Sequence, residues 1–128
     1  MIIAGRARSA PAQPLSFPPA RRLRKPGEFK RVYATGRRMG NEFFTVNTQP
    51  NELTAARLGM SVAVRAMGNA VARNRVRRMI RESFRLNQSI IPALDIVIGV
   101  RAAARSAEPA QLRLSLERLW QKLTLLHS

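Results

Sequence analysis

The stretch from Gly68 to Arg85 constrains the fold more than any other part of the chain. Its apolar side chains recur at the i, i+3, i+4, i+7 spacing, which places them on one face of a helix. That face consists of Ala72, Val76, Met79, Ile80, Ser83 and Phe84. Asn69 is suited to cap the helix N-terminus, and Gly68 eases the turn that leads into it. The pattern therefore predicts a helix with one face in a hydrophobic core.

The remaining surface of this helix is dominated by one charge. It carries Arg73, Arg75, Arg77, Arg78, Arg81 and Arg85. Most charged helix faces are simply solvated, but those faces usually mix both signs. Here Glu82 is the only acid, and it can offset only a near neighbour such as Arg78 or Arg85, by a few tenths of a kcal/mol. A helix that tolerates this repulsion favours a polyanion as its partner.

Composition supports the same class of partner. The chain has 128 residues, enough for one domain with a modest core. Lys and Arg number 23 against 7 acids, which gives a net charge of +16 and points to nucleic acid first and an anionic membrane surface second. A membrane role has little support, because the apolar faces are needed for a core. The absence of cysteine excludes disulfides and suits a cytoplasmic protein.

Local patterns predict the order of the elements. Residues 1–20, rich in Pro and Ala, are expected to form a disordered basic tail, and residues 21–128 a single RNA-binding domain. Within it we expect a helix over 26–34, an edge strand over 37–40, strands over 42–48 and 57–64 paired as a hairpin, the Arg-rich helix, and an interior strand over 95–100. A last helix opens at 106–109, anchored by Trp120, and its apolar stripe consists of Leu112, Leu116, Leu119, Trp120 and Leu123. This αβββαβα order predicts an α+β two-layer sandwich, in which a small mixed sheet of about four strands packs with three helices.

Two aromatic residues of the first helix allow two interpretations. Phe29 and Tyr33 lie one turn apart, on the same face as Val32. They can pack into the core, or they can stack on unpaired bases, since arginines surround them in the sequence. Periodicity does not choose between the two.

The chain lacks a constellation for catalysis of its own. Its acids are scattered over different elements, and its sole histidine, His127, is one residue from the end. No glycine-rich phosphate loop is present, and a metal-dependent nuclease needs several converging carboxylates. We therefore expect no catalytic and no metal-binding residues. The residues predict a nucleic-acid-binding module whose catalytic partner, if any, is another molecule.

The motifs resemble a known family, the protein subunit of bacterial ribonuclease P. The helix carries Gly68-Asn69-Ala70-Val71-x-Arg73-Asn74-Arg75-Val76-Arg77-Arg78-x-x-Arg81-Glu82-x-Phe84-Arg85. Around it stand Phe29-x-x-Val32-Tyr33-x-x-Gly36, Phe43-Phe44, Arg57-Leu58-Gly59-Met60-Ser61-Val62 and Asp95-Ile96-Val97-Ile98 with Arg101. The resemblance covers about residues 21–125.

The resemblance implies a specific role. Proteins of this family bind a large catalytic RNA, and the holoenzyme is an endoribonuclease that removes the 5′ leader of precursor tRNA. The RNA, with Mg²⁺ that it mainly binds, carries the chemistry, and one protein monomer joins one RNA. The family fold also has a left-handed strand–helix–strand crossover around the signature helix. The alternative function is a stand-alone RNA-binding or ribosome-associated protein with no role in cleavage.

The resemblance also assigns residues. Those matched to the catalytic RNA are Arg65, Asn69, Arg75, Arg77, Arg78, Arg81 and Arg85. Those matched to the leader are Phe29, Tyr33, Asn47, Arg73 and Asn74. Two positions depart from the family pattern. Asn47 stands where an aromatic residue is usual, and Arg65 replaces a pair of lysines in a segment, 64–67, that is about one residue longer than expected.

Overall fold

The structure, a computed structural model, describes residues 21–51, 53 and 55–126. The predicted tail over 1–20 and His127 lie outside these residues. The elements are α1 (Pro26–Thr35), β1 (Arg37–Gly40), β2 (Phe44–Pro50), β3 (Arg57–Ser61), α2 (Val64–Met67), α3 (Ala70–Asn87), β4 (Leu94–Val100), the 3-10 helix η3 (Ala102–Ser106) and α4 (Pro109–Leu126). The predicted α+β class and the order of the main elements are confirmed.

The four strands form one mixed sheet in the order β1-β2-β4-β3. β4 pairs antiparallel with β2 and parallel with β3, so the predicted hairpin between β2 and β3 is wrong. Instead β4, which is apolar almost throughout and largely buried, takes the place between β2 and β3. The chain reaches β4 from β3 by a crossover through α2 and α3.

The third strand also ends earlier than its alternating pattern predicts. β3 stops at Ser61, and Val64, expected to close the strand, instead begins the short helix α2 and is 58% exposed. Gly68 ends α2 with a φ of 86°, a backbone conformation that favours glycine. The reversal directs the chain from the sheet edge into α3.

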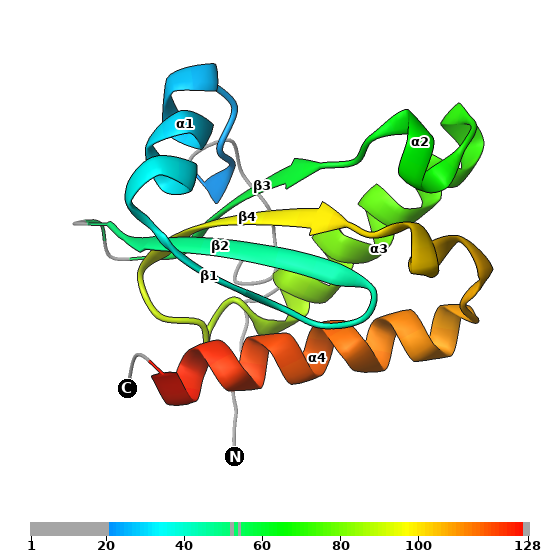
Figure 1. The fold of residues 1–128 in the computed structure, drawn as a ribbon. Coiled ribbons are helices and arrows are strands. Elements are labelled where there is room, and N and C mark those ends of the chain that lie inside the picture. Colours follow the sequence, from blue (N-terminus) through cyan, green and yellow to red (C-terminus); the bar gives the residue numbers. More distant parts are fainter. Residues whose placement is uncertain (1–20, 52, 54, 127–128) are drawn as a thin grey trace, which may run out of the picture.

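Helices α3 and α4 cover one face of the sheet, and α1 lies on the opposite face (Figure 1). The predicted apolar faces are confirmed. Val76, Ile80 and Phe84 of α3 are buried, as are Leu112, Leu116, Leu119, Trp120 and Leu123 of α4. Trp120 is fully buried, meets the Phe84 ring edge-on at a centroid distance of 5.9 Å, and donates from Nε1 to Ser83 Oγ at 2.8 Å. The two helices thus form one layer with fixed spacing.

A charged network fastens α1 to the other face. Arg57 of β3 lies beside Asp95 of β4 in the parallel register and binds it through Nε at 2.8 Å and Nη2 at 2.7 Å. The same guanidinium donates from Nη1 to Glu28 of α1 at 2.8 Å. Glu28 also accepts from the backbone N–H groups of Arg24 and Lys25, both at 3.1 Å. One arginine therefore joins two strands to the start of α1.

These contacts favour the ionised acids. Backbone hydrogen bonding from Lys25 is the largest influence on the pKa of Glu28, which lies below its ordinary value. Burial by itself would raise the pKa of Asp95, but hydrogen bonds from Arg57 and Asn51 outweigh it and hold this pKa below the ordinary 3.8. Because both pKa values are lowered on folding, the stabilisation is complete above the unfolded values and is lost as the pH falls through the lowered ones.

Asp95→Asn should show this dependence directly. The substitution removes one of the two carboxylates that Arg57 binds and leaves Glu28 as its only charged partner in this network. We therefore expect a loss of about 3 kcal/mol in unfolding free energy near pH 7. The deficit should shrink in acid below pH 3.8, because the parent protein also loses the charge on Asp95 as the pH falls through its lowered pKa. Urea denaturation at both pH values measures it. Glu42→Gln, which alters an exposed acid, is the control; a deficit of Asp95→Asn that is equal at both pH values would contradict this account.

Candidate nucleic-acid interface

The N-terminus of α3 is built as its sequence predicts. The Asn69 side chain caps the helix by accepting from the backbone N–H of Ala72 at 2.9 Å. Before it, Gly68 faces the Arg105 guanidinium so closely that a Cβ on Gly68 would lie 2.2 Å from Nη2. A side chain at this position would therefore meet backbone strain, and the exposed Arg105 side chain would have to move aside. Gly68 and Asn69 together fix the direction in which the arginines of α3 leave the core.

The arginines of α3 differ in exposure. Arg75, Arg78 and Arg81 are exposed, together with Asn74, whereas Arg73, Arg77 and Arg85 are partly buried. Glu82 binds Arg85, whose Nε donates to it at 3.2 Å. Hydrogen bonding from Arg85 lowers the pKa of Glu82. Of the two partners expected for this acid, Arg85 is the one it binds.

One part of the arginine surface continues onto α4. Arg75 and Arg78 line a groove of about 470 Å³ between α3 and α4, opposite Arg113 and Glu117. Arg113 is absent from the sequence-based candidates. Its place outside the apolar stripe of α4 marks it as a surface residue, but only the packing of the two helices brings it beside α3.

Another part lies at the β3 edge of the sheet. Arg81 lines a hollow of about 250 Å³ there, with Arg22 and Arg24 from the segment before α1 and with Phe29. The Phe29 ring covers Gly59 so closely that a Cβ on Gly59 would lie 2.4 Å from ring atom Cε1. Phe29 also packs against a small core cluster formed by Leu23, Val32 and Val97. The core interpretation therefore accounts for much of the Phe29 side chain.

Tyr33 has a different environment. It is 50% exposed and lines a hollow of about 420 Å³ with Arg65, Thr45, Ser61 and Gly99 among its neighbours. Small side chains in adjacent strands form the floor, since Thr45, Gly99 and Ser61 lie in one row across β2, β4 and β3. The structure thus brings the predicted residues Tyr33 and Arg65 together and separates the environment of Tyr33 from that of Phe29.

Two other predicted leader residues offer little surface. Asn47 is only 8% exposed, and it lies between Arg38 and Val97 in the sheet register. Arg73 is partly buried, and its Nε is a buried atom without a hydrogen-bond partner among the described residues. Asn74, by contrast, is exposed on α3. The assignment of all three to a ligand stays a prediction.

The described part of the chain shows no alternative chemistry. Within residues 21–51, 53 and 55–126, no three His, Cys, Asp or Glu side chains gather as a metal site. Glu28 and Asp95, the two acids that do approach each other, are joined by Arg57. Among the described helices, none is long and apolar enough to cross a membrane. The surfaces that the described residues of α3 present are mainly cationic.

An α+β sandwich with arginines on its exposed helix and around the hollows beside it defines a class of nucleic-acid-binding protein. Comparisons with known proteins specify the family. The family described as Ribonuclease P matches residues 17–124. The ribonuclease P protein component of Methylococcus capsulatus is 38% identical over 117 residues, which are 91% of each chain. That of Thioalkalivibrio sulfidiphilus is 33% identical over 108 residues, 84% of this chain and 90% of the relative.

Solved structures agree with this match. The Staphylococcus aureus RNase P protein superposes with a TM-score of 0.76 at 38% identity, covering 80% of this chain and 94% of that one. The Thermotoga maritima RNase P protein gives 0.72 at 32% identity, with 79% and 96% covered. The chain therefore belongs to the ribonuclease P protein family. Membership assigns it to the ribonuclease P holoenzyme, with the RNA of that enzyme as partner, and to tRNA processing.

Proposed function

We propose that this protein binds the catalytic RNA of ribonuclease P and the 5′ leader of precursor tRNA, and so assists endonucleolytic removal of the leader. The exposed arginines of α3 carry the proposal. Arg75, Arg78 and Arg81 face solvent on a helix whose single acid binds Arg85. Such a surface gains most from phosphate, because binding releases the counterions of the RNA and relieves the repulsion among the guanidinium groups.

The two RNA molecules are expected to occupy different parts of the surface. The groove with Arg75 and Arg78 and the hollow with Arg81 suit the structured catalytic RNA, since their cations come from several elements. The hollow with Tyr33 suits a single-stranded leader, because an exposed aromatic ring can stack on a base while Arg65 binds a phosphate. The resemblance matches Arg65 to the catalytic RNA. Because Arg65 lines the same hollow as Tyr33, we expect it to lie at the junction of the two RNA molecules.

The chemical step is proposed to belong to the RNA. In phosphate-ester hydrolysis, Mg²⁺ ions stabilise the developing charge and activate a water molecule. We expect the RNA to bind most of these ions. The described acids support this division, because they form no metal site and Asp95 is bound to Arg57. A cytoplasmic complex of one protein and one RNA is the simplest assembly consistent with this role.

Reconstitution tests the proposal. Purified protein combined with the cognate RNA should release the 5′ leader from precursor tRNA at low magnesium, whereas either component alone should not. Gel analysis of end-labelled precursor measures the product. RNA cleavage that is unchanged by the protein would instead favour the stand-alone RNA-binding or ribosome-associated function.

Tyr33→Ala tests the leader site. Loss of one base stack should weaken holoenzyme binding of precursor tRNA by about fivefold or more and leave mature tRNA binding unchanged. Equilibrium binding to both tRNAs measures the difference. Because Tyr33 is 50% exposed, the stability of the protein should change little, and a urea melt serves as the control. Equal weakening for both tRNAs would place Tyr33 outside the leader site.

Reversal of Arg78 and Arg81 to Glu tests the catalytic RNA surface. Each lost phosphate contact should reduce the slope of log K against log salt by about one and weaken assembly with the RNA. Titration of labelled RNA over a range of salt concentrations measures both. Lys30→Glu, a charge reversal at an exposed position of α1, is the control for net charge, and it is compared with Arg78→Glu and Arg81→Glu made singly. An unchanged slope in the Arg78 and Arg81 variant would mean that these side chains face solvent in the complex.

A further inference from the structure

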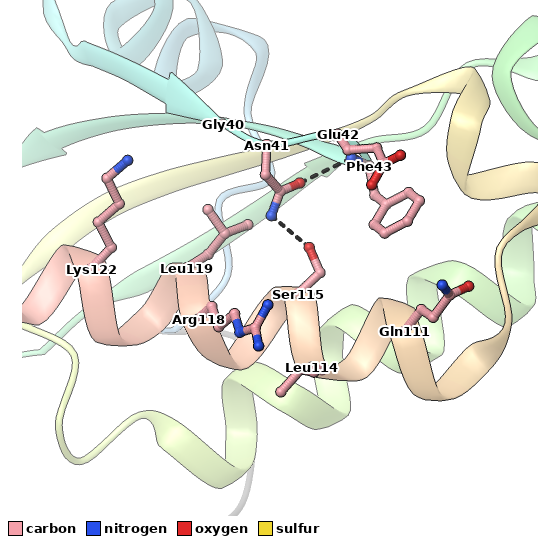
Figure 2. A pocket seen from close by; sticks show the side chains of 10 residues that line it. All are labelled: Gly40, Asn41, Glu42, Phe43, Gln111, Leu114, Ser115, Arg118, Leu119 and Lys122. Atoms are coloured by element: carbon pink, nitrogen blue, oxygen red, sulfur yellow. Dashed lines mark hydrogen bonds between the residues drawn. The ribbon is translucent and has the colours of Figure 1, made fainter.

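A separate groove lies between the turn that joins β1 to β2 and the helix α4. Figure 2 shows its walls, with the turn on one side and successive turns of α4 on the other. Its volume is about 400 Å³, within the range of small-molecule pockets. The lining residues are Gly40, Asn41, Glu42, Phe43, Gln111, Leu114, Ser115, Arg118, Leu119 and Lys122. None of them belongs to α1 or α3, so the groove is independent of the surfaces assigned above.

The width of the groove is fixed by Asn41. Its Nδ2 donates to Ser115 Oγ of α4 at 2.5 Å, and its Oδ1 accepts the backbone N–H groups of Phe43 and Phe44 at 2.9 and 3.0 Å. One side chain therefore shapes the turn and ties it to the helix (Figure 2). A ligand that enters the groove meets walls that are already in place, which lowers the entropy cost of binding.

The lining combines the groups that recognise a nucleotide in a single strand. Arg118 and Lys122 project from α4 and can bind phosphate. The Phe43 ring points from the turn toward α4 (Figure 2). It packs in part against the main core, and the part that stays exposed in the groove can contact a base. Leu114, 47% exposed at the same groove, extends the apolar wall. Glu42 is the only acid among the lining residues, so positive charge prevails.

Other occupants fit the groove less well. An apolar segment of a protein would remove water from Arg118 and Lys122 without pairing their charges. The short apolar wall buries too little surface to offset this desolvation penalty. Structured duplex RNA would present phosphates but no free base for Phe43. An unpaired strand satisfies both the cations and the ring.

We propose that this groove is a second RNA-binding site, which takes a segment of single-stranded RNA with separate phosphates on Arg118 and on Lys122 and a base against Phe43. It lies on the flank of α4 opposite Arg113 and Glu117, which face α3. The protein thus holds RNA on both flanks of α4 and can bind an unpaired strand outside the contacts made by α3.

Matched charge reversals test the site with the full-length protein. The probe is a fluorescein-labelled, unstructured ten-nucleotide RNA followed by anisotropy. Lys122→Glu and Lys30→Glu each change the net charge equally at an exposed helix position, but only Lys122 lines the groove. We expect Lys122→Glu to weaken binding about fivefold or more and to lower the salt slope by about 0.7, the value for one phosphate contact in a single strand. Both reversals are made in the Tyr33→Ala background, which removes the base stack of the proposed leader site. In that background Lys30→Glu should have little effect.

Phe43→Leu supplies the second arm, because it keeps an apolar side chain while it removes the aromatic face. It should weaken binding of the same RNA by about fivefold without changing the salt slope. Equal effects of the two lysine reversals, or a Phe43→Leu variant that binds normally, would overturn the proposal. Sedimentation of the Lys122→Glu and Phe43→Leu variants gives one more outcome. If a variant differs from the parent protein in oligomeric state but not in RNA affinity, the proposal is overturned and the groove is a contact between copies of this chain.

Discussion

The bidentate pair between Arg57 and Asp95, extended to Glu28, is the contact on which the ligand-facing half of the molecule depends. The sheet face that carries α1 has only a small apolar cluster, formed by Leu23, Val32 and Val97. Packing alone therefore gives α1 a weak hold. The charged network fixes the start of the helix on the ends of β3 and β4, and this position sets Tyr33 beside Arg65. A structural ion pair thus governs the geometry of the surface proposed to bind the leader.

The helix α3 serves packing and, in the proposed function, recognition as well. Its buried side, Val76, Ile80 and Phe84, is held by α4 through the contact of Phe84 and Ser83 with Trp120. That rigid support allows the other faces to carry like charges, because the core and not the helix itself supplies the stability. The consequence is a free protein with unneutralised arginines, which have most to gain when phosphate binds.

Local pattern was sufficient where a residue type has one dominant physical use. The capping of α3 by Asn69, the apolar stripe of α4, the burial of Trp120 and the interior place of β4 all followed from periodicity and side-chain chemistry. Pattern failed for β2 and β3, because neighbours along the chain need not be neighbours in a sheet. Pattern also did not decide whether Phe29 and Tyr33 pack into the core or stack on bases. Helical spacing shows that the two rings lie on the same face of α1, but not which residues cover each ring.

Residue order alone indicated the class of partner and the family. The excess of arginine on one amphipathic helix and the motifs around it can be recognised without knowledge of the tertiary contacts. Tertiary structure alone decided which cations share a groove. Arg113 joins Arg75 and Arg78, Arg22 and Arg24 join Arg81, and Asn41 sets the turn against Arg118 and Lys122. Each of these sets combines segments distant in the chain, and their meeting depends on how the sheet orders its strands and how the helices lie across it.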